Sequence, residues 1–241
     1  MGARVKREYA IKHCNRHNEP YQAVCLFSVR GQKVFSDCPK CVMEEEAREQ
    51  ARLEADRKFL EAEIEKARQE ELKFNFEHSN MPKRYRDKKC EMTQNFIKNK
   101  EILESKPQGN IYVYGGIGLG KTMFLCELIK RNLDMRPIYI YGSDLALIQK
   151  KDYAFKNIVE KYDIYGLLVL DEVSFLIENQ FALDLIIDLA YRDAIPLVIC
   201  GNKPLKEFLA DIGERAASRF AEDIQVAKFD GSDLRKKGVD S

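Results

Sequence analysis

The sequence predicts an α/β fold with a mostly parallel sheet, preceded by a small cysteine-containing module and one long helix. From residue 110 onward, short apolar runs of strand length alternate with helical segments, which is typical of a parallel sheet. The first run leads into a glycine-rich turn that opens a helix, and two cysteine-containing pairs stand near the N-terminus. The expected parts are the module at 1–42, a long helix or linker at 43–80, the α/β domain at 81–230 and a flexible tail at 231–241.

The composition fits one globular domain with an appendage, because the 241 residues are 45% hydrophobic and 33% charged. The net charge is only +1, so any nucleic-acid binding must come from local basic patches. The chain has no apolar run of about 18 residues, so we expect no transmembrane helix and no membrane partner. Residues 1–11 lack the apolar stretch of a signal peptide, and we expect a cytoplasmic protein. Seven cysteines in such a protein indicate metal binding or packing rather than disulfides.

The N-terminal module contains a C-x2-H pair that begins at residue 14 and a C-x2-C pair that begins at residue 38. Two such pairs, each held in a tight turn, are how small zinc modules are built. A short β-hairpin within 21–34, turning near Gly31, would connect them. Cys25 and His13 are rival ligands, and a reduced module without metal is the alternative. The matching spacers favour one set of zinc ligands, namely Cys14, His17, Cys38 and Cys41.

Residues 42–78 predict one long helix, because Ala, Glu, Arg, Lys and Leu dominate them. Favourable charge pairs four residues apart, such as Glu44 with Arg48, support it. One apolar row recurs every seven positions, as half of a heptad seam, at Leu53, Leu60, Ala67 and Phe74. The helix is then either a solvated connector or a docking element for a partner or a second copy.

A basic and aromatic segment, 83–86, follows Pro82, which ends the long helix, and leads into helical residues 91–105. Such a segment can hold an adenine ring or a nucleic-acid backbone. A solvated linker is the alternative.

A predicted strand at 111–114 runs into a complete P-loop pattern, with Gly115 followed four residues later by Gly-Lys-Thr. Glycines allow positive φ angles that turn backbone N–H groups inward, and the following helix N-terminus adds partial positive charge. Lys121 can reach the outer phosphates, and the Thr122 hydroxyl can bind Mg²⁺. A glycine turn that precedes a helix by chance is the alternative. The predicted phosphate-binding residues are Gly115, Gly116, Ile117, Gly118, Leu119, Gly120, Lys121 and Thr122.

The remaining strands are predicted at 137–141, 166–170, 196–200 and 224–228. The helices between them are predicted at 122–134, 143–162, 176–192 and 204–221, the second and fourth with a break.

Polar side chains follow two of these strands. Asp171 and Glu172 come directly after 166–170, at the carboxyl end of a strand, where open α/β sheets bind ligands. Asp171 can hold Mg²⁺ through water, and Glu172 can orient or deprotonate an attacking water. Asn202 could position that water or touch the γ-phosphate, although Asn-Lys-Pro is also an ordinary turn.

Arg215 and Arg219 lie four residues apart and share one face of a predicted helix. An arginine supplied by a neighbouring subunit can stabilise the charge that develops in phosphoryl transfer. A surface salt bridge is the alternative.

Together these stretches resemble the DnaC-type replicative helicase loaders, within the DnaC/IstB-like AAA+ ATPases. The resemblance covers roughly residues 14–228, and the N-terminal module resembles the phage and prophage branch. It implies an AAA+ P-loop NTPase core with a five-stranded parallel sheet and no C-terminal lid, and ATP, Mg²⁺ and Zn²⁺ as ligands. By that resemblance Gly115–Thr122 is Walker A, Asp171 and Glu172 are Walker B, Asn202 is sensor 1 and Arg219 is a trans-acting arginine finger. Gly201 departs from the family, which has a small hydroxyl residue there.

The same resemblance implies an inserted helix that touches single-stranded DNA. Lys150 and Tyr153 fall where its basic and aromatic contacts lie, a pairing that suits phosphate and base. The match is loose, and a solvated helix face is the alternative.

The implied function is ATP-dependent loading of a hexameric replicative DNA helicase onto single-stranded DNA. The N-terminal module and helix would grip the helicase, and self-assembly would bring Arg219 to the next subunit's site. Two alternatives remain: an IstB-like transposition helper, against which the cysteine module argues, and a non-hydrolysing DNA-binding adaptor, against which Glu172 and Arg219 argue.

Overall fold

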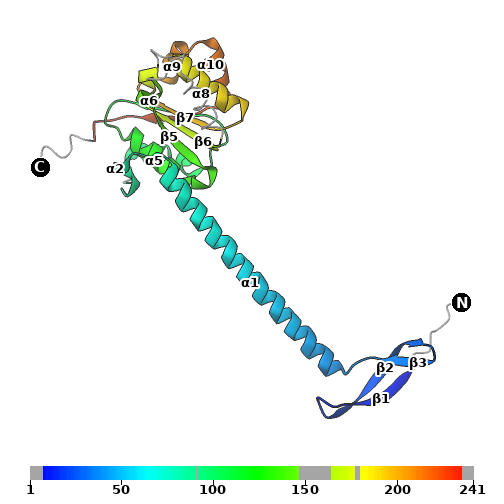
Figure 1. Ribbon diagram of the computed structural model, residues 1–241. Coiled ribbons are helices and arrows are strands. Elements are labelled where there is room, and N and C mark those ends of the chain that lie inside the picture. Colours follow the sequence, from blue (N-terminus) through cyan, green and yellow to red (C-terminus); the bar gives the residue numbers. More distant parts are fainter. Residues whose placement is uncertain (1–7, 91, 147–163, 177–179, 235–241) are drawn as a thin grey trace, which may run out of the picture. The chain divides into compact units, whose positions relative to one another are not determined.

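The computed structural model describes residues 8–90, 92–146, 164–176 and 180–234 (Figure 1). The chain divides into two compact units, Met1–Arg68 and Gln69–Ser241, which we describe separately. None of the described helices combines the length and the apolar character that a membrane span requires.

The first unit contains a three-stranded antiparallel sheet with the order β1-β2-β3, formed by β1 (Tyr9–Cys14), β2 (Glu19–Val29) and β3 (Gln32–Phe35). Arg30 and Gly31 have φ angles of 49° and 84°, which is the conformation of a tight two-residue hairpin turn. The predicted hairpin and its turn near Gly31 are therefore confirmed. Strand β1 was not predicted, because most of its side chains are exposed and give no burial pattern.

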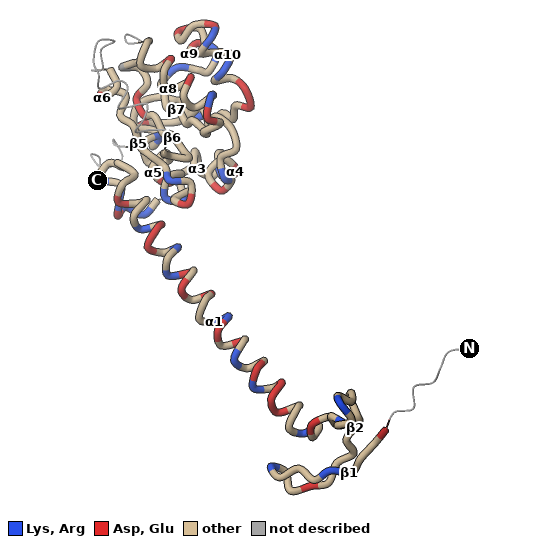
Figure 2. The backbone as a smooth tube through the Cα atoms, turned by 45° about the vertical axis from the view of Figure 1, so that its right-hand side comes forward, with Lys and Arg blue, Asp and Glu red and all other residues tan. Residues whose placement is uncertain are grey.

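Helix α1 (Pro39–His78) is 40 residues long, and among its residues only Asn75 is buried. Figure 2 shows acidic and basic residues interspersed along it, and Glu54 and Lys58 form an ion pair of 2.8 Å. The long helix predicted from composition is confirmed. Its apolar row is exposed at Leu53, Leu60 and Phe74, so docking on a partner through that row stays a prediction.

The second unit is built on a five-stranded parallel sheet with the order β5-β6-β7-β4-β8. Buried parallel strands are continuous apolar runs, and the predicted strands agree with the observed ones to within one residue at each end. The bounds are β4 (Ile111–Gly115), β5 (Pro137–Tyr141), β6 (Leu167–Asp171), β7 (Leu197–Gly201) and β8 (Gln225–Phe229).

Helices cover both faces of this sheet and bury one apolar cluster on each side (Figure 1). One side carries α3 (Gln94–Lys98), α4 (Lys100–Glu104) and α5 (Lys121–Arg131). The other carries α8 (Gln180–Arg192), α9 (Leu205–Asp211) and α10 (Glu214–Phe220). Short elements complete the described chain: α2 (Lys83–Arg86), η1 (Leu133–Met135), α6 (Gly142–Ala146) and η2 (Val173–Leu176).

Two helix predictions need correction. The predicted helix at 91–105 is two short helices, because Asn99 ends α3 and its side-chain amide bonds to the backbone carbonyls of Asn95 and Lys228. The predicted helix at 122–134 ends at Arg131 and continues as η1. The predicted helix at 176–192 corresponds to α8, which is described from Gln180 to Arg192; residues 177–179 lie outside the described residues.

The strand order positions the candidate site. Strand β7 lies between β4, which leads into the glycine-rich turn, and β6, which ends in acidic residues. Because the strands are parallel, the residues that follow all three meet at one edge of the sheet.

Candidate functional site

The glycine-rich turn between β4 and α5 has the backbone that a phosphate-binding loop needs. Gly118 and Gly120 have φ angles of 76° and 93°, which side-chain-bearing residues rarely adopt. Lys121 is the first residue of α5, and its Nζ donates to the carbonyls of Gly115 and Gly116, at 2.7 Å each. The ammonium group therefore lies over the loop, within reach of an anion bound there.

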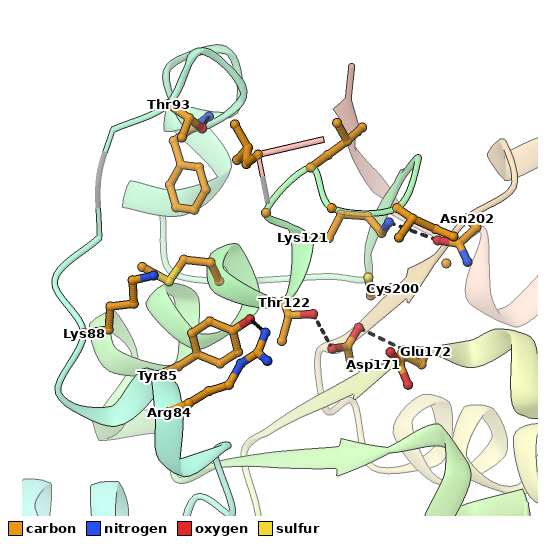
Figure 3. Close-up of a pocket in the computed structure, with 18 of the residues that line it drawn as sticks. Arg84, Tyr85, Lys88, Thr93, Lys121, Thr122, Asp171, Glu172, Cys200 and Asn202 are labelled. Atoms are coloured by element: carbon orange, nitrogen blue, oxygen red, sulfur yellow. Dashed lines mark hydrogen bonds between the residues drawn. The ribbon is translucent and has the colours of Figure 1, made fainter. Parts of the chain in front are cut away.

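Asp171 and Thr122 bring a carboxylate and a hydroxyl together at the end of β6 (Figure 3). Thr122 Oγ1 donates to Asp171 Oδ2 at 2.9 Å, and the Glu172 N–H donates to Asp171 Oδ1 at 2.9 Å. Asp171 is only 4% exposed, so these bonds compensate for burying the carboxylate. Hydroxyl and carboxylate oxygens are suitable ligands for Mg²⁺, and the pair fits such an ion.

Glu172 is exposed next to Asp171, and both residues line a cavity that is described below. Its φ angle of 58° lies in the left-handed region, which costs a residue with a side chain about 1–2 kcal/mol. A Cβ at Gly142 would lie 2.4 Å from the Glu172 carbonyl oxygen, so the backbone approach in this region requires a glycine at 142. Strained residues of this kind cluster at functional sites.

Asn202 follows β7, and its Oδ1 accepts a hydrogen bond of 3.0 Å from Lys121 Nζ. The structure thus brings this amide to the phosphate-binding loop. The structure explains why the residue before Asn202 is a glycine, because a Cβ at position 201 would lie 2.6 Å from the Tyr112 hydroxyl. That hydroxyl donates to the Lys203 carbonyl at 2.8 Å, so Tyr112 occupies the space that a larger residue at 201 would need.

A cavity of about 660 Å³ joins these groups. Its second wall is formed by the basic and aromatic segment and the chain that follows it, through Arg84, Tyr85, Lys88, Thr93 and Phe96. The Arg84 guanidinium lies 4.5 Å from the centre of the Tyr85 ring. The segment therefore lines the cavity and is not a purely solvated linker, and contact with an adenine ring or a nucleic-acid backbone stays a prediction.

The C-terminal stretch supplies a further part of the cavity that the sequence did not indicate. Leu234 lines the cavity, and its N–H donates to the Gly118 carbonyl at 3.0 Å. Asp233 and Leu234, expected to form part of a flexible tail, thus lie against the phosphate-binding loop, and 235–241 fall outside the described residues. No local motif marks this contact, because only the tertiary fold brings the two segments together.

The two arginines of α10 pair with Asp188 on α8. Arg215 contacts the Asp188 carboxylate at 2.9 Å, and Arg219 bonds to its other oxygen and lies over the Tyr191 ring. Among the described residues that line the cavity there is no residue of α10. A role for Arg219 in a neighbouring site therefore stays a prediction, as do DNA contacts by Lys150 and Tyr153, which lie outside the described residues.

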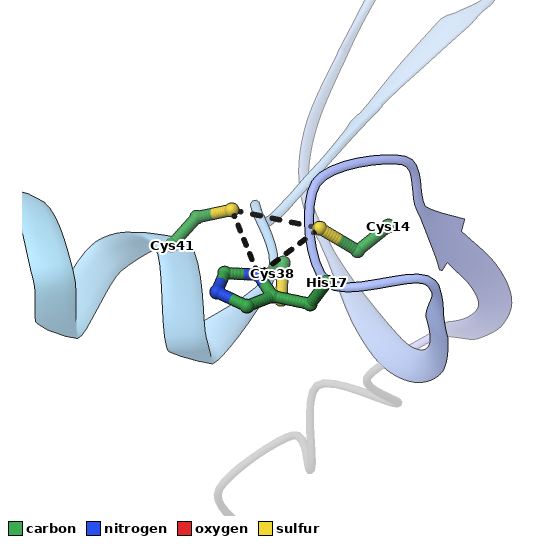
Figure 4. A group of neighbouring side chains, drawn as sticks. All are labelled: Cys14, His17, Cys38 and Cys41. Carbon is green, nitrogen blue, oxygen red and sulfur yellow. Dashed lines mark hydrogen bonds between the residues drawn. The ribbon is translucent and has the colours of Figure 1, made fainter.

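Four side chains of the N-terminal unit converge as a candidate metal centre (Figure 4). Cys14 ends β1, His17 lies in the following turn, and Cys38 and Cys41 flank the start of α1. Their ligand atoms all lie within 4.8 Å of one another. The rivals do not join them: Cys25 Sγ bonds instead to the Phe27 carbonyl, and His13 is exposed.

The spacing of these atoms fits zinc. His17 Nδ1 lies 3.4 Å from the sulfurs of Cys14 and Cys41 and 3.7 Å from that of Cys38, and the Cys14 and Cys41 sulfurs are 3.5 Å apart. A tetrahedral site with Zn–S of about 2.3 Å and Zn–N of about 2.0–2.1 Å has edges of about 3.8 Å between sulfurs and about 3.5 Å between nitrogen and sulfur. The cluster can therefore hold zinc with little rearrangement.

The pKa shifts in the cluster follow from its internal hydrogen bonds. Hydrogen bonds from His17, chiefly from its backbone, lower the pKa of the Cys14 thiol to about 6, and the neighbouring Cys14 raises the pKa of Cys41 to about 11. His17 Nε2 lies 2.9 Å from Glu44, whose hydrogen bond raises the His17 pKa to about 9. A carboxylate behind a ligand histidine orients the ring, here with Nδ1 toward the sulfurs.

Comparison with known proteins identifies relatives of the fold. No family model and no curated protein matches the chain. A solved structure assigned as a primosome component from Streptococcus pyogenes aligns with 67% of this chain and 97% of its own, with 17% identity and a TM-score of 0.51. DnaA bound to AMPPCP and single-stranded DNA aligns with 63% of this chain, with 22% identity and a TM-score of 0.49. DnaI aligns with 62%, with 14% identity and a TM-score of 0.47.

The chain spans about half the length of two matching proteins: it covers 51% of DnaA and 46% of a DNA replication initiation factor. At these identities the likeness concerns the fold. The phosphate-binding loop, the five-stranded parallel sheet and the acidic residues that end β6 agree with it. The second unit of this chain therefore has the fold of an AAA+ P-loop NTPase, and the unit before it carries a Cys/His cluster able to hold zinc.

Proposed function

We propose that the chain is an ATPase that loads a hexameric replicative DNA helicase onto single-stranded DNA. The observation that carries the ATPase part is the convergence of Lys121, Thr122, Asp171 and Asn202 at one sheet edge, linked by hydrogen bonds of 2.9–3.0 Å. Glu172 stands beside them on the wall of the same cavity.

Each residue has a role that follows from its place. The backbone N–H groups of Gly115–Thr122 and the Lys121 ammonium bind the phosphates. Thr122 and Asp171 would hold Mg²⁺, which would neutralise negative charge on the bound phosphates. Glu172, exposed to the cavity, orients the attacking water and accepts its proton, and Asn202 positions that water against the γ-phosphate.

The replication part of the proposal is supported by the structural likeness to the primosome component, which the chain covers almost fully at 97% of its length. The partner-docking part is supported by the first unit. Its sheet exposes large apolar side chains, including Ile11, Leu26 and Phe27, and α1 exposes its apolar row. Exposed apolar groups of this kind, next to polar ones, are common at protein interfaces.

The test of this function is complex formation with the cognate helicase. We expect the full chain to co-elute with the hexameric helicase on size exclusion when ATP is present, and to be released as ATP is hydrolysed on single-stranded DNA. Glu172→Gln should still bind ATP but should lose turnover by about a hundredfold or more, and should stay in the complex. Absence of a complex with or without ATP would refute the loader function, and capture of a transposase instead would favour the transposition helper.

The proposed trans role of Arg219 allows a complementation experiment. Arg219→Ala should reduce turnover about a thousandfold, the size of effect that an arginine finger supplies. Mixing Arg219→Ala with Glu172→Gln should restore part of the activity, because one interface then combines the intact acids of the first variant with the arginine of the second. Arg215→Ala is the matched control, since Arg215 shares α10 and the Asp188 partner. A mixture no more active than its components would contradict a shared site.

A further inference from the structure

Asp171 has a second hydroxyl partner, which is buried in the apolar cluster on the α5 side of the sheet. Tyr139 is in the middle of β5, the strand next to β6, and its side chain is 1% exposed. Its hydroxyl donates to Asp171 Oδ2 at 2.5 Å. Thr122 donates to the same oxygen from the side of the phosphate-binding loop. The carboxylate is therefore held between one donor at the cavity and one donor in the core.

The Tyr139 hydroxyl and the adjacent Cys200 thiol both form hydrogen bonds to the Asp171 carboxylate. Hydrogen bonds of this kind compensate for the hydration that a carboxylate loses when it is buried.

The backbone of Tyr139 is held as firmly as its side chain. Its N–H donates to the Ser79 carbonyl at 2.7 Å, and its carbonyl accepts from Asn80 Nδ2 at 3.0 Å. Ser79 and Asn80 directly follow α1, so one edge of β5 is paired with the end of the long helix. The opposite edge pairs with β6. The Tyr139 backbone is thus hydrogen-bonded on one side to the residues after α1 and paired on the other with β6.

We propose that Tyr139 is a positioning residue for the metal ion of the bound nucleotide: its hydroxyl holds the Asp171 carboxylate in the rotamer that faces Thr122. The inference rests on the proposed nucleotide site and adds a residue to it. Partners behind a metal ligand commonly change metal affinity about 10–100-fold when they are removed. The sequence did not reveal this role, because a tyrosine inside an apolar strand has the pattern of an ordinary core residue.

The test compares Tyr139→Phe with Tyr112→Phe in the full-length protein. Both substitutions remove one buried hydroxyl and keep the ring; Tyr112 is 0% exposed and donates to the Lys203 carbonyl instead. The readout is the Mg²⁺ concentration at which a fluorescent ADP analogue reaches half of its Mg²⁺-dependent gain in affinity. We expect this midpoint to rise about tenfold in Tyr139→Phe and to stay unchanged in Tyr112→Phe. Nucleotide affinity measured in EDTA should be the same in both variants and in the wild type.

The outcomes separate the inference from the function on which it rests. An unchanged Mg²⁺ midpoint in Tyr139→Phe, with wild-type nucleotide binding intact, would overturn the role of Tyr139 and leave the nucleotide site standing. Equal shifts in both variants would overturn it too, since they would indicate a general loss of packing that thermal unfolding also records. A wild-type protein that binds no nucleotide at any Mg²⁺ concentration would refute the proposed function and the inference with it.

Discussion

Lys121→Ala abolishes ATP binding and leaves the fold intact: this is the expected result with the largest effect on the nucleotide site. In the structure the Lys121 ammonium donates to two loop carbonyls and to Asn202, so it is already directed over the phosphate-binding loop. A bound triphosphate would offer it charged oxygens, and hydrogen bonds to charged groups contribute about 1.5–3 kcal/mol each. Losing two of them weakens ATP binding at least about a hundredfold.

The fold should survive this substitution because alanine is the best helix former and residue 121 is the first residue of α5. Titration with a fluorescent ATP analogue measures the affinity, and circular dichroism checks the fold. Lys130→Ala is a suitable control, since Lys130 lies on the same helix and bonds only to the Lys88 carbonyl among the interactions described. An affinity equal to that of the wild type would refute the assignment of Gly115–Thr122 as the phosphate-binding loop.

Loss of zinc should unfold the N-terminal sheet. Within described residues 8–38, only Cys14, Ala23 and Cys38 are buried, and two of these are proposed ligands. So small an apolar core cannot stabilise a module by itself, and modules of this size commonly depend on metals. A structural zinc contributes about 10–16 kcal/mol of apparent binding free energy, which in such modules is folding free energy.

We therefore expect freshly purified protein to contain one zinc per chain, measured by elemental analysis, and Cys38→Ser to lose it. Limited proteolysis should then cut within the sheet of the first unit while ATP affinity stays unchanged. Cys25→Ser provides the control, because Cys25 lies in the same sheet but outside the cluster, and it should retain the metal. Protein without metal, or Cys38→Ser with its zinc intact, would leave Cys14, His17, Cys38 and Cys41 as a packed cluster.

Much of the fold could be read from the sequence because its signals are local. Strands β6 and β7 are buried on both faces, so each is a short apolar run with turn residues at its ends. The phosphate-binding loop is continuous in sequence, and so are the acidic residues that end β6. Strand β1 was missed for the converse reason, since an exposed strand in a small module has no apolar run to reveal it.

The partners of the site residues could not be read in this way. Nothing near Asp171 in sequence indicates that Tyr139 bonds to it, and nothing near Arg219 indicates its pairing with Asp188. The contact of Leu234 with Gly118 joins segments more than a hundred residues apart in the chain. Each of these contacts depends on which strands and helices become neighbours, and that order is a property of the whole sheet.

The sequence by itself thus determined which residues form the two candidate sites. Glycines with a lysine and a threonine indicate a site for phosphate and Mg²⁺, and paired cysteines with a histidine indicate a site for zinc. The tertiary structure decided how those residues are held. Placing β7 between β4 and β6 brings Asn202 to Lys121, and placing β5 beside β6 brings Tyr139 to Asp171. The physical reason is that a binding motif consists of residues that stand close together in the sequence. The orientation of their side chains, in contrast, is set by packing and hydrogen bonds with residues far away in the sequence.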